Sequence, residues 1–281
     1  MAKMNGAALE NISATKTATN TDTAVETGSA VETSTVVAST AALQDQSSLI
    51  TDYLQQSGLI QNYADLVTDI EPLVAKHQAA LSQFLLEHTV TNLRWQYQIP
   101  ELGEGGACSI FAQLQPEPYD LIKTLSADSA RCTIHSTTAL TNLQAITNYY
   151  QQHTNLDWFG IYQSRVNQQS EAVLVKLAYY GAESRPEFPL TVEFAEYSNN
   201  STVGLSGVAK VINNVADYVA GGGEYYTCDP KVSAEACLPL FDQSGKIVGI
   251  IDAEDFNNNV FTADAIALLV AICITVPQYL P

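Results

Sequence analysis

A thiol and several carboxylates lie close together in the sequence between residues 228 and 254. Cys228 is followed at once by Asp229, and Glu235, Asp252 and Glu254 come after them. The segments that carry the last three acids have the apolar character of strands, where carboxylates that need only solvent are out of place. Asp252 and Glu254 are two residues apart, so a strand turns both side chains to the same face. These residues predict a chemical site.

Charge and composition limit the partners of such a site. Among the 281 residues, acidic side chains outnumber basic ones 30 to 12, which gives a formal net charge of −18. This sign repels nucleic acid and anionic membranes, so we expect neither as a partner. No apolar stretch approaches the roughly 18 to 20 residues of a membrane-spanning helix, and residues 1–10 hold no apolar core of a signal peptide. We therefore expect a soluble, cytoplasmic protein.

The cysteines and histidines show no spacing typical of disulfides or metal sites. The five cysteines are Cys108, Cys132, Cys228, Cys237 and Cys273. They are odd in number and include no CxxC pair and no cluster with histidine, which argues against a disulfide framework and a zinc site. The four histidines have no metal-ligand spacing. We expect no metal and no tightly bound cofactor.

Composition divides the chain into three parts. Residues 1–46 are rich in Ser, Thr and Ala and contain no aromatic residue, which predicts a disordered tail. Residues 47–130 form a helical extension and connector, with apolar residues at helical spacing broken near Gly58 and Pro72. These helices could pack on a second copy of the chain, so a homodimer is a candidate assembly. Residues 131–281 form the main domain.

The main domain has the pattern of an α+β fold, an antiparallel sheet flanked by helices. The expected elements are a helix over residues 141–153, strands over 158–162, 172–180 and 188–194, a short helix opened by 203–209, strands over 236–241 and 247–254, and a helix over 263–276. The last two strands are joined by a turn that contains Gly245, and Thr262 caps the last helix. The helix entry at Gly204 to Gly207 would present free N–H groups to an anionic group of a ligand.

Seven motifs in order resemble a GAF domain over about residues 135 to 278. They are Asn155-Leu156-Asp157-Trp158-Phe159-Gly160-Ile161-Tyr162, Gly204-Leu205-Ser206-Gly207, Cys228-Asp229, Ser233-x-Glu235, Leu238-Pro239-Leu240, Gly249-Ile250-Ile251-Asp252-x-Glu254 and Phe261-Thr262-x-Asp264. Among GAF domains, they are most similar to the free methionine-R-sulfoxide reductases. This resemblance implies a GAF-like fold and the thiol-dependent reduction of free L-methionine-(R)-S-oxide to methionine.

The implied reaction assigns roles to the residues of the site. A thiolate attacks the sulfur, an acid protonates the departing oxygen, and a second thiol resolves the sulfenic acid that remains. Cys228 would be the attacking thiol, with Asp229 as its catalytic neighbour. The acids could hold the ammonium group of a free amino acid, and the rings could form an apolar and cation–π wall. The resemblance implies substrate contacts at Trp158, Tyr162, Ser206, Glu235, Asp252 and Glu254.

The chain departs from the reductase pattern in its cysteines. The family has three, and Ser206 stands where one of them belongs, in Gly-x-Cys-Gly; no cysteine occurs between Cys132 and Cys228. A resolving thiol would have to be Cys237, Cys108 or Cys132, or an external reductant such as a thioredoxin-like protein. Neighbouring carboxylates would also raise the pKa of Cys228, unless a bound substrate neutralises them.

Three functions therefore stay open. The first is the reductase, an oxidoreductase acting on a sulfur group. The second is a non-catalytic GAF module that senses a small ligand, which Ser206 and the N-terminal helices favour. The third is a scaffold that binds no ligand. Cys237 and Trp158 also have a purely structural interpretation, because buried thiols and rings are common in cores, and Gly204 and Gly207 can simply form a tight turn.

Overall fold

One antiparallel sheet forms the centre of the protein in the computed structural model, which describes residues 47–103, 109–125, 129–225 and 229–281. In this part of the chain, its six strands follow the order β7-β6-β5-β10-β9-β8. Their bounds are β5 (Trp158–Val166), β6 (Ala172–Tyr180), β7 (Glu187–Pro189), β8 (Lys210–Ile212), β9 (Ala234–Phe241) and β10 (Ile247–Asp255). Four further strands precede them in the chain and pair as β1 (Gln96–Tyr97) with β4 (Tyr119–Asp120) and β2 (Pro100–Leu102) with β3 (Ser109–Leu114).

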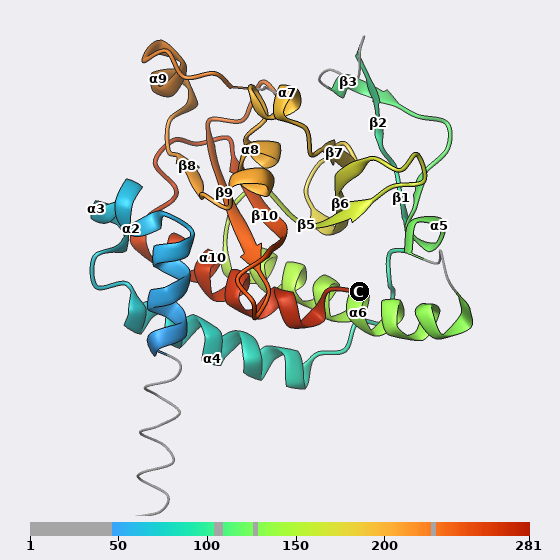
Figure 1. Cartoon of the computed structure of the whole chain (residues 1–281), viewed down its shortest axis with the longest axis horizontal. Coiled ribbons are helices and arrows are strands. Elements are labelled where there is room, and N and C mark those ends of the chain that lie inside the picture. Colours follow the sequence, from blue (N-terminus) through green and yellow to red (C-terminus); the bar gives the residue numbers. More distant parts are fainter. Residues whose placement is uncertain (1–46, 104–108, 126–128, 226–228) are drawn as a thin grey trace, which may run out of the picture. The chain divides into compact units, whose positions relative to one another are not determined.

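Helices cover both faces of this sheet (Figure 1). After a helix over residues 47–56, the described helices are α2 (Leu59–Asn62), α3 (Ala64–Val67), α4 (Glu71–Glu87), α5 (Leu121–Leu125), α6 (Ser129–His153), α7 (Val192–Ala195), α8 (Asn199–Ser206), α9 (Val215–Ala220), α10 (Ala263–Thr275) and the 3-10 helix η2 (Val276–Tyr279). Helices α6 and α10 pack on one face, and α4 packs on α10. Helix α8 contacts β9 and β10 and covers the other face.

The α+β prediction is confirmed, and the central strands lie where the sequence pattern puts them. β6 has the predicted bounds, and β5, β9 and β10 contain the predicted strand segments. Gly245 in the β9–β10 turn has a φ of 79°, a conformation that favours glycine. The Thr262 hydroxyl accepts a hydrogen bond from the N–H of Ala265 and begins α10.

The predicted strand over residues 188–194 is wrong in its second half. The strand β7 ends at Pro189, and α7 begins at Val192. Thr191 changes the local structure, because its hydroxyl accepts a hydrogen bond from the N–H of Phe194 at 3.2 Å and caps this short helix.

The predicted helix entry at Gly204 to Gly207 is also wrong, because this segment is the C-terminal end of α8. The helix begins after Ser198, whose hydroxyl accepts a hydrogen bond from the N–H of Ser201 at 3.3 Å. Gly207 has a φ of 69° and is the C-cap, a common position for glycine in the left-handed region. The segment therefore presents carbonyl groups, and an anion-binding role for it does not hold.

The N-terminal extension packs against the sheet at two places. The Tyr53 hydroxyl donates a hydrogen bond to the carbonyl of Pro239 in β9, and the Tyr63 hydroxyl accepts one from the N–H of Val211 in β8, both at 2.9 Å. At the other end of the sheet, the Tyr97 hydroxyl donates to the carbonyl of Lys176 in β6 at 2.8 Å. The described residues form one compact unit. The predictions for residues 1–46 lie outside the described part of the chain.

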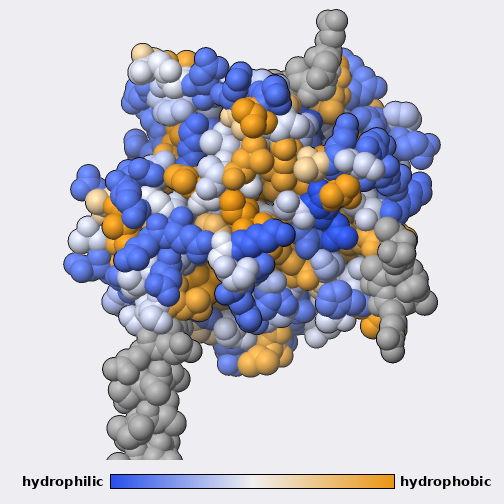
Figure 2. All heavy atoms as spheres, viewed as in Figure 1, coloured by the Kyte–Doolittle hydropathy of each residue, from blue (hydrophilic) through white to orange (hydrophobic). Residues whose placement is uncertain are grey.

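The surface is largely polar. Figure 2 shows hydrophilic side chains over most of one face, with a patch of apolar ones over α7 and α8. In these helices Val192 and Leu205 are exposed, while Val203 is buried beneath. Within the described residues, none of the helices has the length and apolar character that crossing a bilayer requires.

Candidate active site

Three carboxyl groups meet on the face of the sheet that α8 covers. Glu254 of β10 pairs directly with Glu235 of β9, and Asp252 pairs with Cys237 two residues along the same ladder. Directly paired residues of antiparallel strands point to the same face, which brings the three acids together. Glu235 is 5% exposed and Asp252 is 2% exposed. The period-two spacing predicted that Asp252 and Glu254 share a face, and the pairing of β9 with β10 adds Glu235 to them, although carboxylates are rarely buried.

The first turn of α8 provides hydrogen bonds to two of these acids. The amide of Asn200 donates to Oδ2 of Asp252 at 3.0 Å, and Asn199 hydrogen-bonds to Glu235. Tyr225 also donates its hydroxyl proton to Glu235. Among the described residues, Oδ1 of Asp252 is buried and has no hydrogen-bond partner. Buried polar atoms are nearly always satisfied, so this oxygen is a candidate contact for a ligand.

Burial and mutual repulsion hold protons on these acids. Burial, followed by the charge of Glu235, raises the pKa of Glu254 to about 8. Burial also raises the pKa of Asp252 well above its ordinary value, with further contributions from Glu235 and Glu254, and it raises that of Glu235. Repulsion between neighbouring carboxylates favours the protonated form, and Glu254, with a pKa of about 8, is largely protonated near pH 7. The cluster can therefore donate a proton as well as accept a positive group.

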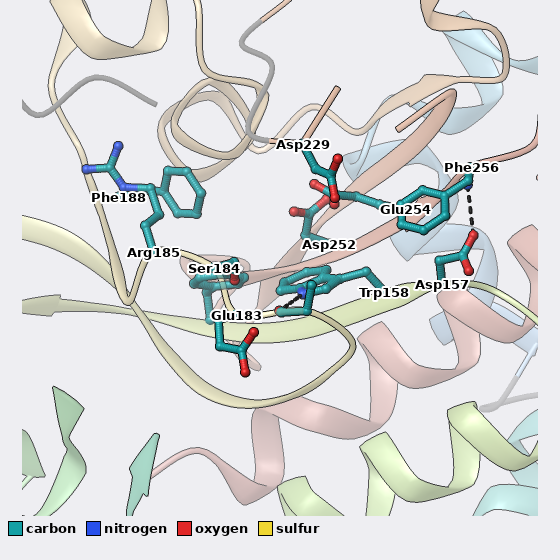
Figure 3. Close-up of a pocket in the computed structure, with 12 residues that line it drawn as sticks. Asp157, Trp158, Glu183, Ser184, Arg185, Phe188, Asp229, Asp252, Glu254 and Phe256 are labelled. Atoms are coloured by element: carbon teal, nitrogen blue, oxygen red, sulfur yellow. Dashed lines mark hydrogen bonds between the residues drawn. The ribbon is translucent and has the colours of Figure 1, made fainter. Parts of the chain in front are cut away.

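A small cavity opens beside the acids. Its volume is about 60 Å³, which is enough for a few ordered waters or a small polar group. Figure 3 shows Asp229, Asp252 and Glu254 on one side of it, with the Trp158 ring below them. Its lining consists of Asp157, Trp158, Tyr162, Ala182, Glu183, Ser184, Arg185, Phe188, Asp229, Asp252, Glu254 and Phe256. Acids, aromatic rings, the hydroxyls of Tyr162 and Ser184 and the guanidinium of Arg185 thus line the same space.

The aromatic wall depends on a glycine in β5. Trp158 and Tyr162 are buried and point to the face of the acids, and the Trp158 N–H donates to the carbonyl of Ala182 at 3.0 Å. Gly160 lies between them, and a Cβ atom there would collide with the Trp158 ring and reach within 3.0 Å of the Tyr162 ring. The lack of a side chain at this position leaves the indole its place in the wall.

The predicted site residues fall into three groups. Trp158, Tyr162, Asp229, Asp252 and Glu254 line the cavity, and Glu235 belongs to the same acid cluster. Ser206 lies elsewhere, exposed at the end of α8, where its hydroxyl donates to the carbonyl of Thr202 at 2.7 Å. Cys228, the predicted attacking thiol, lies outside the described residues, as does Cys108. The catalytic assignment of Cys228 and Asp229 therefore stays a prediction.

Cys237 is a fully buried thiol next to the acids. It pairs with Asp252 on one side and with Lys210 of β8 on the other. Burial raises its pKa well above the ordinary value, and the charges of Asp252 and Glu235 raise it further. A thiol in this environment stays protonated at neutral pH, which disfavours nucleophilic attack. Its role as a resolving thiol remains a hypothesis.

Sequence reasoning missed several polar residues of the site. Asn199 and Asn200 follow Ser198 in the sequence, and a serine followed by two asparagines is a signal for a helix start rather than for a ligand site. Lys176 stands alone in an apolar strand and is completely buried behind the Trp158 ring. Its charge lowers the pKa of Glu254, against the effect of burial. Across the described residues, no group of three or more His, Cys, Asp or Glu side chains is arranged to hold a metal ion.

Comparison with known proteins identifies one family. Residues 139–278 match the family model of the GAF domain. No curated protein matches the chain in a sequence comparison. Similar solved structures include the type II free methionine-R-sulfoxide reductase of Thermoplasma acidophilum, with 20% identity over 52% of this chain and 94% of that chain and a TM-score of 0.44.

Two further solved structures show the range of similar chains. The free methionine-R-sulfoxide reductase of Neisseria meningitidis, in complex with its substrate, has 20% identity over 52% of this chain and 83% of that chain, with a TM-score of 0.41. The GAF domain of an Acinetobacter phosphoenolpyruvate-protein phosphotransferase has 13% identity over 53% of this chain and 87% of that chain, with a TM-score of 0.40. Such identities do not transfer an activity, so the function rests on the residues of this cavity.

Proposed function

Residues 139–278 of this chain are a GAF domain, and we propose that its acidic cavity binds a small free amino acid, with methionine-(R)-sulfoxide as the substrate. The observation that carries this proposal is the set of three carboxyl groups around a cavity, with one buried oxygen of Asp252 left without a partner among the described residues. An ammonium group would satisfy that oxygen and offset the repulsion between the acids. The aromatic wall suits a thioether-sized side chain. Because the cavity of about 60 Å³ has room for only a few waters, binding of the amino acid requires its walls to move apart.

The proposed reaction transfers the sulfoxide oxygen to a thiol. The Cys228 thiolate attacks the sulfoxide sulfur while a protonated carboxyl donates a proton to the oxygen. The sulfur–oxygen bond breaks, methionine leaves, and the oxygen remains on Cys228 as a sulfenic acid. A second thiol then forms a disulfide with Cys228 and releases water, and a further thiol reduces that disulfide.

Glu254 is the group best suited to donate the proton. Its pKa of about 8 keeps it largely protonated at neutral pH, and it lines the cavity. Asp229 lies beside Cys228 in the sequence and also lines the cavity. The second thiol would come from outside the cavity, such as a small thiol or a thioredoxin-like protein, because the described part of the cavity lining contains no cysteine. No tightly bound cofactor is needed for these steps.

A ligand-sensing module without turnover is the second candidate function. The position that would hold a family cysteine is Ser206, and its hydroxyl is engaged with its own helix. Cys237 is buried and protonated, as described above. If no second thiol can reach Cys228, the same cavity would bind the amino acid and report its presence without reducing it.

A coupled assay separates the two candidates. We expect the protein to reduce free L-methionine-(R)-sulfoxide with dithiothreitol or thioredoxin, to leave the (S)-epimer unreduced, and to lose the reaction in Cys228→Ser. Cys273→Ala is the matched control, because it removes a thiol from the core behind the opposite face of the sheet. Binding by titration calorimetry without turnover would support the sensing module. If neither epimer binds, the proposed function is wrong.

A further inference from the structure

A lysine is enclosed behind the cavity by aromatic rings. Lys176 in β6 is 0% exposed. Its Nζ lies 3.9 Å from the ring centre of Tyr179, 5.0 Å from that of Tyr97 and 5.8 Å from that of Trp158. It also donates to the carbonyl and the hydroxyl of Ser184, at 2.8 and 2.6 Å. This geometry is that of an aromatic cage around a cation.

One side of the cage comes from the extension. Tyr97 lies in β1, outside the residues that match the GAF domain. It is buried, and its hydroxyl donates to the carbonyl of Lys176, so it fixes the main chain as well as covering the ammonium group. Arg94, two residues before this strand, lies over the Tyr179 ring, 4.9 Å from its centre.

Two contacts of Lys176 belong to the cavity wall. Ser184 and Trp158 both line the cavity and lie near one another in Figure 3. The Trp158 N–H bonds to Ala182, two residues before Ser184, so the ammonium group and the indole hold the same loop from two directions. The wall that faces the acids is therefore fixed by a cation that lies behind it.

A structural role alone is a poor explanation for this lysine. Removing an ammonium group from water is costly, and an apolar side chain of similar length would fill the same space without that cost. The positive charge has its counterpart in the acid cluster in front of the wall. It lowers the pKa of Glu254, whereas Glu235 and Asp229 raise it.

We propose that Lys176 is a positioning residue of the acidic cavity, which holds the wall formed by Trp158 and Ser184 and moderates the charge of the acids, and that Tyr97 of the N-terminal extension completes its cage. This inference rests on the proposed binding of an amino acid in the cavity. It gives the extension a function in the GAF domain site, which a GAF domain of residues 139–278 alone would lack.

Several other charged groups surround this arrangement and enter its pH dependence. Around the cage they are Arg94 and Tyr97 of the extension, Tyr179 of β6, Glu183 of the wall loop and Glu187 of β7. Around Glu254 they are Glu235 of β9, Asp252 of β10, Tyr225 and Asp229. The test therefore compares variants of the same protein under identical conditions, so that in each variant only the substituted group differs from the wild-type protein.

The test uses Lys176→Met in the full chain. Selective carboxyl labelling and NMR would follow the titration of Glu254, assigned by the loss of its signal in Glu254→Gln. In a Trp95→Phe background, the fluorescence of Trp158 would report the wall, because the chain has two tryptophans. We expect the pKa of Glu254 to rise, the Trp158 emission to shift to longer wavelength, and the affinity for methionine sulfoxide to fall roughly tenfold through the loss of the cage.

Two further variants make the result specific. Lys246→Met removes a lysine from the exposed β9–β10 turn and should change none of the three measurements. Tyr97→Phe removes only the hydroxyl group and should move all three in the same direction as Lys176→Met but less, and it keeps the proposal testable if Lys176→Met does not fold. An unchanged Glu254 titration and Trp158 emission in both cage variants would overturn the proposal. If the wild-type protein binds no methionine sulfoxide, the proposed function fails, while these two ligand-free measurements still decide the role of Lys176.

Discussion

The two faces of the central sheet are built from the same strands but differ in the side chains that they bury. In β10, Ile251 and Ala253 are fully buried among apolar residues on one face. Asp252 and Glu254, which alternate with them, lie on the other face and form the acid cluster with Glu235. The first face lies against α10 and α6, and the second lies beneath α8. The apolar face stabilises the folded chain through the burial of apolar side chains. The acidic face contains buried carboxyl groups, which lower the stability of the folded chain when they are ionised.

The comparison shows how a small domain can tolerate buried acids. Burial of apolar side chains contributes about 25 cal/mol per Å² removed from water, and the face against α10 and α6 contains the fully buried Leu238 and Ile251, which pair with each other. The stabilisation from the apolar face offsets the cost of burying carboxyl groups, whose pKa values are raised by that burial. We expect changes on the apolar face to alter folding, and changes on the acidic face to alter binding and its pH dependence.

The largest effect is expected on the apolar face. Leu238 in β9 is fully buried, so Leu238→Ala should lower the free energy of unfolding by about 2–5 kcal/mol through lost burial and a residual cavity. Urea denaturation at pH 7 measures it. The folded fraction should still bind methionine sulfoxide. A loss below about 1 kcal/mol would mean that this face is not the main source of stability.

The matching change on the acidic face is Asp252→Asn. It prevents the ionisation of the carboxyl group that we expect when the ammonium group binds, so binding of methionine sulfoxide should weaken by about 1.5–3 kcal/mol, the usual range for a hydrogen bond to a charged group. Titration calorimetry measures this loss. The free energy of unfolding should stay the same or rise, because the amide relieves repulsion. Unchanged affinity would remove Asp252 from the binding site.

The acidic face should also make stability depend on pH. The pKa of Glu254 is about 8 in the folded chain against an ordinary value of 4.5, so the folded state binds its proton more tightly. The resulting stabilisation is complete below about pH 4.5 and is lost as pH rises through 8. We expect a decrease of roughly 1–3 kcal/mol in the free energy of unfolding between pH 5 and 9, discounted for partial exposure.

Glu254→Gln tests this cause directly. The glutamine does not titrate, so the slope of stability against pH should become flatter across the range from 5 to 9. Denaturant titrations at several pH values would measure both slopes. A slope as steep in the variant as in the wild-type protein would assign the pH dependence to Asp252, Glu235 or another group.

The smallest effect is expected from substitutions of the N-cap residues of α8 and α10, one helix on each face of the sheet. Ser198→Ala removes the N-cap of α8, and Thr262→Ala removes that of α10, and each should cost about 1 kcal/mol in the free energy of unfolding. Only Ser198→Ala should also weaken ligand binding, because Asn199 and Asn200 hold two acids from the first turn of α8. Equal effects of the two variants on binding would contradict this difference between the faces.

Local alternation was sufficient to predict the acidic side of the sheet. In β10, polar and apolar residues alternate with a period of two, so Asp252 and Glu254 could be placed together without knowledge of the fold. The turn at Gly245 and the cap at Thr262 were predicted for the same reason, since each depends on residues within a few positions. The burial of these acids beneath α8 depends on contacts across more than 50 residues, such as that between Asn200 and Asp252.

The errors have identifiable physical causes. Gly204 and Gly207 fit a helix start or a helix end equally well, and the cap at Ser198 decides between them. Lys176 gave no signal, because its burial depends on Tyr97, which is 79 residues away in the sequence. A single lysine in an apolar strand is ordinarily placed with its head in water. Contacts of this range cannot be obtained from the pattern of one chain.

The space above Gly160 has a consequence for control experiments. Since even one methyl group there would collide with the indole of Trp158, Gly160→Ala displaces one wall of the cavity while every carboxyl group, thiol and lysine stays in the chain. This variant keeps the net charge and the titrating groups, and so distinguishes shape from electrostatics as the source of selectivity.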